Sequence, residues 1–343
     1  MSKKKSAYAE AGVDIDEMMS GLQAIKRMVK STNVPGVLSD IGSFGGLFKS
    51  PGKESVLVSS ADGVGTKLNV AVQAGRHRTI GQDLVNHCTN DILVQGAEPM
   101  FFLDYLGTAR LSGQIFQDVV WGLCKACREN NCALLGGETA EMPGLYPDGE
   151  YDLVGTIVGS VERKKIITGK SIRKGDVLIG LPSSGLHTNG YSLARKVIFD
   201  KAKLSLDDLL PGTKRSVADH LLAVHKSYLT PTKALMKKVK VHGMAHITGG
   251  GLVDNVPRVL PDGLSAVIDR DSWTVPTLFQ FIQEAGKVDR EEMYRVFNMG
   301  IGYVYMVRAK DLDASMKILK AQRARPVVIG QVEKGSDPVR FTG

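Results

Sequence analysis

The segment Asp62–Lys67 (DGVGTK) places a carboxylate, two glycines, a hydroxyl and an ammonium group in one short stretch. The apolar and β-branched residues Val56–Val58 before it predict a buried strand, and Leu68–Gly75 after it has apolar residues at helical spacing. Backbone amides freed by glycines at a helix N-terminus can bind phosphate. In such a site Lys67 neutralises phosphate charge and Asp62 holds Mg²⁺. The segment lacks the Walker pattern, so a structural turn with Asp62 as the helix cap remains the alternative.

Three polar residues share one face of a helix predicted over Thr79–Gly96, because Asp83, His87 and Asp91 are spaced four residues apart. A divalent metal ion can use the two carboxylates. The alternative is a polar helix face whose acid near the N-terminus is favoured by the helix dipole. For His87 the sequence favours this alternative.

Three glycine-rich segments are candidates for ligand-binding loops. Gly136–Gly144 (GGETAEMPG) carries Glu138 and Glu141 three residues apart, which is more typical of a ligand-binding loop than of a hairpin. Pro182–Gly190 (PSSGLHTNG) supplies amides and hydroxyls that suit a phosphate or a ribose. His246–Gly251 (HITGGG) ends in three consecutive glycines, which mark a tight turn or the close approach of a ligand.

Both strands and helices are expected along the chain. Strands are expected at Met100–Tyr105, Cys132–Leu135, Tyr151–Glu162, Asp176–Leu181, Leu264–Ile268, Ile301–Val307 and Val327–Val332. Helices are expected at Asp14–Ser31, Thr79–Gly96, Ser112–Asn130, Leu252–Val256, Thr277–Ala285 and Asp311–Ala321, with two more within Val217–Val239. The polar, basic segment Ile166–Lys174 separates a domain of residues 1–165 from one of residues 166–343, as the chain length allows.

Composition places the chain among ordinary globular proteins and argues against a membrane protein. Hydrophobic residues make up 43% of the chain and charged residues 23%. No apolar run is long enough to span a membrane, and the basic N-terminus lacks the apolar segment of a secretory signal, so we expect a cytoplasmic protein. The pair Cys124 and Cys127 has no second pair at zinc spacing, which favours reduced thiols in the core.

The net charge is divided unevenly along the chain. Residues 1–165 contain 17 Lys and Arg against 19 Asp and Glu, a net charge of −2, whereas residues 166–343 contain 27 against 17, a net charge of +10. A basic half attracts an anion, either nucleic acid or a phosphorylated small molecule, unless the lysines are simply solvated. With only 6% aromatic residues and no recognition motif, the sequence argues against nucleic acid.

Nine motifs follow one another along the chain. They are AGVDID at 11–16, DGVGTK at 62–67, NDILVQGAEP at 90–99, FFLDY at 101–105, GGETAEMPG at 136–144, SSGLHTNGYSL at 183–193, HITGGG at 246–251, EEMYRVFNMGIG at 291–302 and IGQV at 329–332. In this order and spacing the chain resembles phosphoribosylformylglycinamidine cyclo-ligases along essentially its whole length.

The resemblance implies an enzyme of purine biosynthesis that uses ATP and Mg²⁺. Its reaction closes the ring of formylglycinamidine ribonucleotide through phosphorylation of the formamide oxygen, and gives 5-aminoimidazole ribonucleotide, ADP and phosphate. The resemblance also implies an α/β fold of the α+β type with two domains per chain, and a homodimer in which the N-terminal domains form a β-barrel; we expect no nucleic-acid or membrane partner. The nearer alternatives are related ATP-using enzymes, thiamine monophosphate kinase and selenophosphate synthetase. The latter is expected to carry a reactive Cys near its N-terminus, and here no Cys precedes Cys88.

The resemblance implies roles for individual residues. The implied metal ligands are Asp62 and Asp91, with Glu138 and Glu141 as further candidates. The catalytic candidates are Asp62, Lys67 and His187. Of these, His187 is a proton shuttle or phosphate donor, or it only orients its loop. Nucleotide or phosphate contacts are implied for Lys26, Gly63, Gly65, Thr66, Asn189, Gly249, Gly250 and Gly251.

Three features depart from the family pattern. Ala61 stands where the family usually has a threonine, and the segment Ser39–Gly46 (SDIGSFGG) is less rich in glycine than usual. His87 stands where the family usually has an apolar residue. The resemblance therefore adds no catalytic role for His87.

Overall fold

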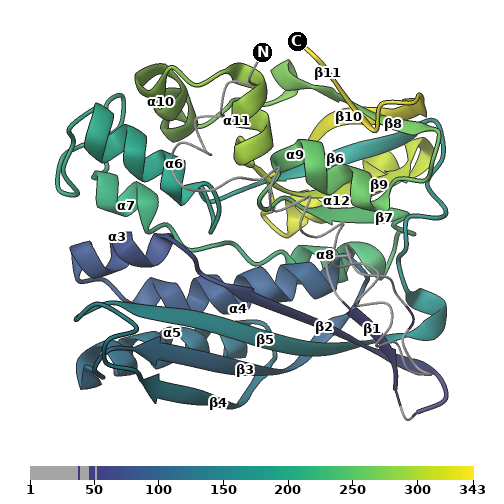
Figure 1. Ribbon diagram of the computed structural model, residues 1–343. Coiled ribbons are helices and arrows are strands. Elements are labelled where there is room, and N and C mark those ends of the chain that lie inside the picture. Colours follow the sequence, from purple (N-terminus) through teal and green to yellow (C-terminus); the bar gives the residue numbers. More distant parts are fainter. Residues whose placement is uncertain (1–37, 39–45, 51) are drawn as a thin grey trace, which may run out of the picture.

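Two mixed β-sheets with helices packed against them form the part of the chain that the structure describes (Figure 1). The structure is a computed structural model, and it describes residues 38, 46–50 and 52–343. The predicted α/β class with two sheet-containing units is confirmed. The helix predicted at Asp14–Ser31, and with it Lys26, lies outside the described residues. Of the helices described, none has the length and apolar character needed to cross a membrane.

The first sheet has five strands in the order β1-β2-β5-β3-β4, in which β3 and β4 are parallel and the other neighbours are antiparallel. The strands are β1 (Gly46–Lys49), β2 (Ser55–Gly63), β3 (Glu98–Thr108), β4 (Ala133–Glu141) and β5 (Tyr151–Glu162). The helices of this half are α3 (Lys67–Ala74), α4 (Arg78–Leu93) and α5 (Gly113–Glu129). Alternate residues of β5 are buried, the pattern of a strand with one covered face, and its predicted bounds are confirmed.

The second sheet has six strands in the order β11-β8-β10-β6-β9-β7, in which only β8 and β11 are parallel. The strands are β6 (Asp176–Pro182), β7 (Gly243–His246), β8 (Leu264–Asp269), β9 (Ile301–Arg308), β10 (Val327–Lys334) and β11 (Val339–Thr342). The helices are α6 (Tyr191–Arg195), continued by a π-helical segment (Lys196–Lys201), α7 (Val217–Leu221), α8 (Leu229–Met236), α9 (Gly251–Asn255), α10 (Thr277–Gly286), α11 (Arg290–Val296) and α12 (Leu312–Ala321). Short 3-10 helices occur at Arg163–Lys165, Val256–Val259, Arg270–Ser272 and Ala309–Asp311.

Two segments that the sequence analysis treats as loops are strands. β2 continues through Asp62 and Gly63, because its ladder with β5 runs on to the pair of Gly63 with Val154. The segment Gly136–Glu141 pairs residue by residue with β3, so this part of the predicted Gly136–Gly144 loop is a strand. At Gly137 an added Cβ would lie 2.4 Å from the backbone oxygen of Asp104. The glycine is therefore needed for close strand packing, which outweighs its turn preference.

Helix α4 lies between the first sheet and the second half of the chain (Figure 1). The polar face of α4 is buried against residues 225–228. Its side chains form hydrogen bonds with the backbone of that segment. The backbone N–H of His225 donates to Asp83 Oδ1 at 2.7 Å, and Asn86 Nδ2 donates to the His225 carbonyl at 2.7 Å. One turn further on, Asn90 Nδ2 donates to the Lys226 carbonyl at 2.8 Å. These contacts fix the second half relative to α4.

Candidate active site between the two halves

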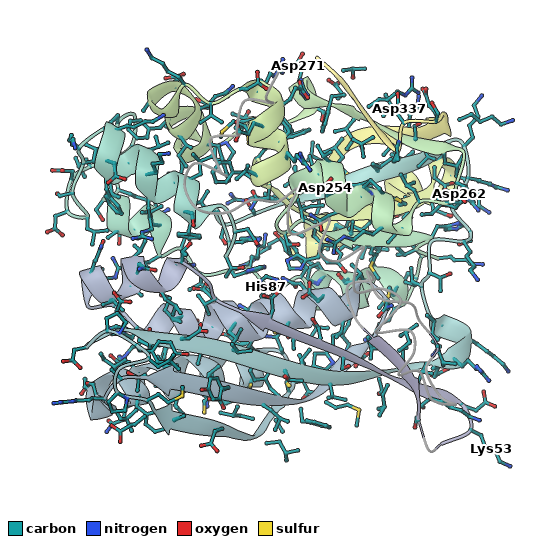
Figure 2. All side chains as sticks on the ribbon, in the orientation of Figure 1. Lys53, His87, Asp254, Asp262, Asp271 and Asp337 are labelled. Atoms are coloured by element: carbon teal, nitrogen blue, oxygen red, sulfur yellow. The ribbon has the colours of Figure 1, made fainter. Side chains whose placement is uncertain are left out.

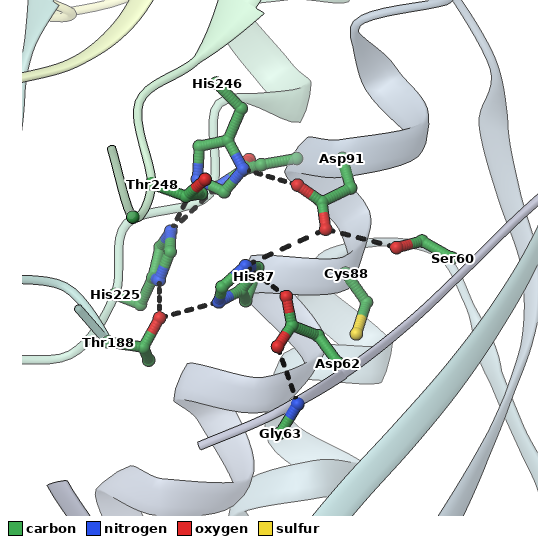
Figure 3. Close-up of polar contacts among 12 residues, drawn as sticks. Ser60, Asp62, Gly63, His87, Cys88, Asp91, Thr188, His225, His246 and Thr248 are labelled. Atoms are coloured by element: carbon green, nitrogen blue, oxygen red, sulfur yellow. Dashed lines mark hydrogen bonds and ion pairs between the residues drawn. The ribbon is translucent and has the colours of Figure 1, made fainter. Parts of the chain in front are cut away.

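Side chains from both halves of the chain converge beside α4 (Figure 3). The first half supplies Asp62 at the end of β2, and His87 and Asp91 on α4. The second half supplies Thr188, just before α6, and His246 at the end of β7. His87 lies where the two halves meet (Figure 2). The carboxylates predicted as metal ligands, Asp62 and Asp91, are therefore brought together.

His87 is the centre of this cluster. Its Nε2 lies 2.8 Å from Asp62 Oδ2 and 3.7 Å from Asp91 Oδ2, and its Nδ1 lies 2.6 Å from Thr188 Oγ1. Burial lowers the pKa of His87, but the carboxylates of Asp62 and Asp91 outweigh burial and raise that pKa to about 9. His87 thus joins the two acids, and its assignment to a merely polar helix face was wrong.

Three further histidines extend the cluster into the second half. His246 Nδ1 lies 2.8 Å from Asp91 Oδ1, and His246 Nε2 lies 3.0 Å from His225 Nε2. The ring of His225 stacks on that of His187 with centroids 4.0 Å apart. Burial, reinforced by neighbouring positive groups, lowers the pKa of all three of these histidines well below the usual value. They are therefore neutral imidazoles at neutral pH.

The loop that precedes α6 points polar atoms into the site. His187 has a φ of 63°, is buried, and accepts a hydrogen bond from the Ser184 N–H at its Nε2. Within the described part of the chain, His187 Nδ1 and Asn189 Nδ2 are buried without a hydrogen-bond partner. Buried polar atoms without partners are costly, so these two atoms are suited to receive a ligand.

The glycine turn Gly249–Gly251 lies against this loop, since a Cβ at Gly249 would be 3.2 Å from Asn189 Oδ1. Gly250 and Gly251 have φ angles of 93° and 58°, which favour glycine. A Cβ at Gly251 would lie 2.0 Å from the Tyr294 carbonyl oxygen at α11. Packing and backbone conformation therefore account for these two glycines before any ligand is considered.

Lys67 differs from its predicted role as a phosphate contact. Its side chain is fully buried, with Nζ 2.8 Å from Asp83 Oδ2, and it donates to the carbonyls of Ala223 at 2.8 Å and His187 at 3.1 Å. Burial lowers the pKa of Lys67 and raises that of Asp83 to about 6. Because the protein itself engages the ammonium group, Lys67 fixes the backbone of the His187 loop and does not face open space.

The rest of DGVGTK lies at the outer side of the cluster. The Gly63 N–H donates to Asp62 Oδ1 at 2.7 Å. Gly65 is exposed with a φ of 67°, and Thr66 is exposed with its Oγ1 3.2 Å from Ser192 Oγ on α6. Gly65 and Thr66 are thus the accessible part of the motif, at the start of α3.

Glu138 and Glu141 are not brought to this cluster. Asp62 pairs with Gly155, Gly155 with Asp104, and Asp104 with Gly137, so three strand spacings separate Asp62 from β4. That is roughly 14 Å between the backbones. The carboxylates accept local hydrogen bonds instead, Glu138 from the Thr139 N–H and Glu141 from the Leu111 N–H. Within one chain these glutamates do not join Asp62 on a metal ion.

Comparison with known proteins agrees with this two-part arrangement. The family profile of AIR synthase related proteins matches with its N-terminal domain over residues 36–161 and with its C-terminal domain over residues 173–342. The chain is thus an AIR synthase related protein in both of its halves. A phosphoribosylformylglycinamidine cyclo-ligase of Geobacter metallireducens is 53% identical over 337 residues, 97% of each chain, and one of Bacillus cytotoxicus is 48% identical over 98% of each chain. The chain belongs to the phosphoribosylformylglycinamidine cyclo-ligase family.

Solved structures share the fold at much lower sequence identity. A thiamine-monophosphate kinase from Stenotrophomonas maltophilia superposes with a TM-score of 0.64 at 19% identity, covering 92% of this chain and 94% of that one. The hydrogenase maturation protein HypE in complex with ATP superposes with a TM-score of 0.62 at 18% identity, covering 91% and 85%. At these identities the likeness describes the fold alone.

Proposed function

We propose that this chain closes the imidazole ring of formylglycinamidine ribonucleotide at the expense of ATP, and releases 5-aminoimidazole ribonucleotide, ADP and phosphate. The observation that carries the proposal is the 53% identity to a named cyclo-ligase across 97% of both chains. The unpartnered buried atoms of His187 and Asn189 agree with a site that receives a polar ligand. Two units, residues 1–165 and 166–343, and a cytoplasmic location remain part of the proposal.

The nucleotide site that we propose opens beside Asp62. HypE, which has the same fold, is described in complex with ATP. The accessible Gly65 and Thr66, together with Gly63 and Asn189, are the candidates for phosphate contacts here; Lys26 is a further candidate outside the described residues. The basic excess of residues 166–343 suits the phosphate of the ribonucleotide.

The carboxylates of this site fit Mg²⁺ only in part. Mg²⁺ prefers oxygen ligands and is usually held by one or two carboxylates together with substrate phosphates. Both oxygens of each carboxylate already have protein partners, but the Asp62 side chain is 39% exposed whereas that of Asp91 is 7% exposed. We therefore assign Mg²⁺ to Asp62 and the ATP phosphates. Asp91 is the more buried of the two carboxylates and is not assigned to this ion. Bound Mg²⁺ would neutralise phosphate charge during transfer.

In the mechanism that we propose, the formamide oxygen attacks the terminal phosphoryl group of ATP. The amidine-side nitrogen then attacks the formyl carbon, and the oxygen departs with the phosphate. Neutral His187, whose Nδ1 lacks a partner within the described chain, is the candidate to hold or move a proton. Lys67 acts as a positioning residue, because it holds the His187 carbonyl. Incubation with the ribonucleotide, ATP and Mg²⁺ tests the proposal, which requires one ADP for each aminoimidazole product.

The outer face of the first sheet is the surface through which we propose that two chains associate into the barrel. Leu103 and Tyr105 on β3 and Val154 and Val158 on β5 lie on the face opposite the buried Phe102 and are exposed or half-buried. Apolar patches of this kind mark protein interfaces. The homodimer therefore buries residues that would otherwise face water.

Leu103→Arg is expected to convert the dimer into monomers, because a guanidinium in the centre of this face would be desolvated without a partner. Leu103 is 37% exposed, so the folded monomer tolerates the change. The matched control is Leu209→Arg, at an exposed leucine of the second half. Sedimentation at micromolar concentration should give a monomer for the first variant and a dimer for the second. A dimer in both variants would remove this face from the interface.

A further inference from the structure

Two imidazoles and two carboxylates meet in the buried part of the site (Figure 3). One ligand atom of each of His87, Asp91 and His246 lies within 4.8 Å of the other two, and all three residues are buried. Asp62 Oδ2 lies beside this set, 2.8 Å from His87 Nε2. These residues come from β2, α4 and the end of β7, so the fold converges on one point from three elements.

Hydrogen bonds on the far side of each ring orient the two imidazoles. His87 Nδ1 lies 2.6 Å from Thr188 Oγ1, and His246 Nε2 lies 3.0 Å from His225 Nε2. A bound metal ion would take the place of the proton between His87 Nε2 and the carboxylates, while His87 Nδ1 and His246 Nε2 keep their protons and donate them outward. Metal-binding histidines are normally oriented in this way by a second hydrogen bond.

The carboxylates are fixed in the same manner. Ser60 Oγ donates to Asp91 Oδ2 at 3.1 Å, and the Gly63 N–H donates to Asp62 Oδ1 at 2.7 Å. Each of the four side chains therefore has an outer partner that holds it in place. A set of imidazole nitrogens and carboxylate oxygens suits Zn²⁺ and other first-row transition metals, whereas Mg²⁺ prefers oxygen alone.

We propose that His87, His246 and Asp91 bind one divalent first-row transition metal ion. Asp62 stays with Mg²⁺ and the ATP phosphates, and the three ligands of this site need neither ATP nor the ribonucleotide. An ion held there joins α4 of the first half to His246 of the second half. It therefore stabilises the junction between the two halves as well as occupying the site.

Titration of chelator-treated, dialysed protein with Zn²⁺ tests the proposal. The titration is followed by calorimetry in excess Mg²⁺ and without ATP, and we expect one Zn²⁺ per chain. Co²⁺ in place of Zn²⁺ should give the visible absorption bands of a low-symmetry site with nitrogen ligands. His87→Gln and His246→Gln are each expected to weaken Zn²⁺ binding by about 100-fold or more, since loss of an outer partner alone costs about 10- to 100-fold.

His242→Gln is the matched control. His242 is also buried, and its Nδ1 contacts the Ser171 carbonyl at 3.0 Å, away from the cluster. This variant should bind Zn²⁺ like the wild type. Absence of Zn²⁺ binding by the wild-type protein, unchanged binding in both cluster variants, or displacement by an equal concentration of Mg²⁺ would overturn the proposal. Ring closure is assayed separately, so its absence with intact Zn²⁺ binding counts against the proposed function alone.

Discussion

Asp62→Asn is expected to slow ring closure by about 100-fold or more, because the enzyme loses charge where the transferred phosphoryl group must be stabilised. Asparagine keeps the size of the side chain and can still accept the Gly63 N–H, so the change removes charge with little change of shape. The expected effect falls on kcat at saturating ATP, measured as formation of the aminoimidazole product. The variant should fold like the wild type.

Asp219→Asn controls for the loss of one carboxylate. Asp219 forms an exposed ion pair with Arg76 at 2.8 Å, with both side chains 45% exposed. An exposed pair of this kind contributes little to stability, about 0 to 1 kcal/mol. The control should therefore retain nearly full activity. A near-normal rate for the Asp62 variant would end the assignment of Asp62 to the reaction.

Lys67→Met is expected to lower the free energy of unfolding by about 3–5 kcal/mol, because it leaves Asp83 buried without its counter-ion. It also leaves the carbonyls of His187 and Ala223 without their ammonium donor. Methionine fills a similar volume, so the cost comes mainly from the uncompensated charge and the lost hydrogen bonds. Chemical denaturation measures the change.

The destabilisation caused by Lys67→Met depends on pH through Asp83. Burial raises the pKa of Asp83 to about 6 even with Lys67 present. Without Lys67 this pKa rises further, so the folded variant binds a proton that the unfolded chain releases at lower pH. The destabilisation is then greatest above the raised pKa and shrinks as the pH falls through it. The double variant Lys67→Met/Asp83→Asn should be more stable than the single variant at high pH. A double variant as unstable as the single one would contradict this explanation.

Elements with strong local patterns could be predicted from the sequence. The alternation along Tyr151–Glu162 predicts a strand with one covered face, and the structure has it with the same bounds. The four-residue spacing of Asp83, His87 and Asp91 predicts one helix face, and all three contact the second half or the site. Both predictions depend on periodicity, which neighbouring residues determine.

The contribution of His225 to the site could not be predicted in this way. His225 lies in a segment without a motif, and α4 holds it there through hydrogen bonds to Asp83 and Asn86, some 140 positions earlier. Gly63 and Gly137 were misleading, because glycine usually indicates a turn. Both residues lie in long strand ladders, which outweigh that preference. Lys67 looked like a phosphate contact, but partners distant in sequence bury it. Each failure arises where long-range contacts decide the local structure.

The fate of the formamide oxygen tests the central claim most directly. Formylglycinamidine ribonucleotide labelled with ¹⁸O in its formyl group is converted with ATP and Mg²⁺, and the inorganic phosphate is analysed by mass spectrometry. Phosphorylation of that oxygen predicts that the label leaves in phosphate, with one ADP for each aminoimidazole ribonucleotide. Product formed with the label released into water, or ADP formed without ring closure, would contradict the account.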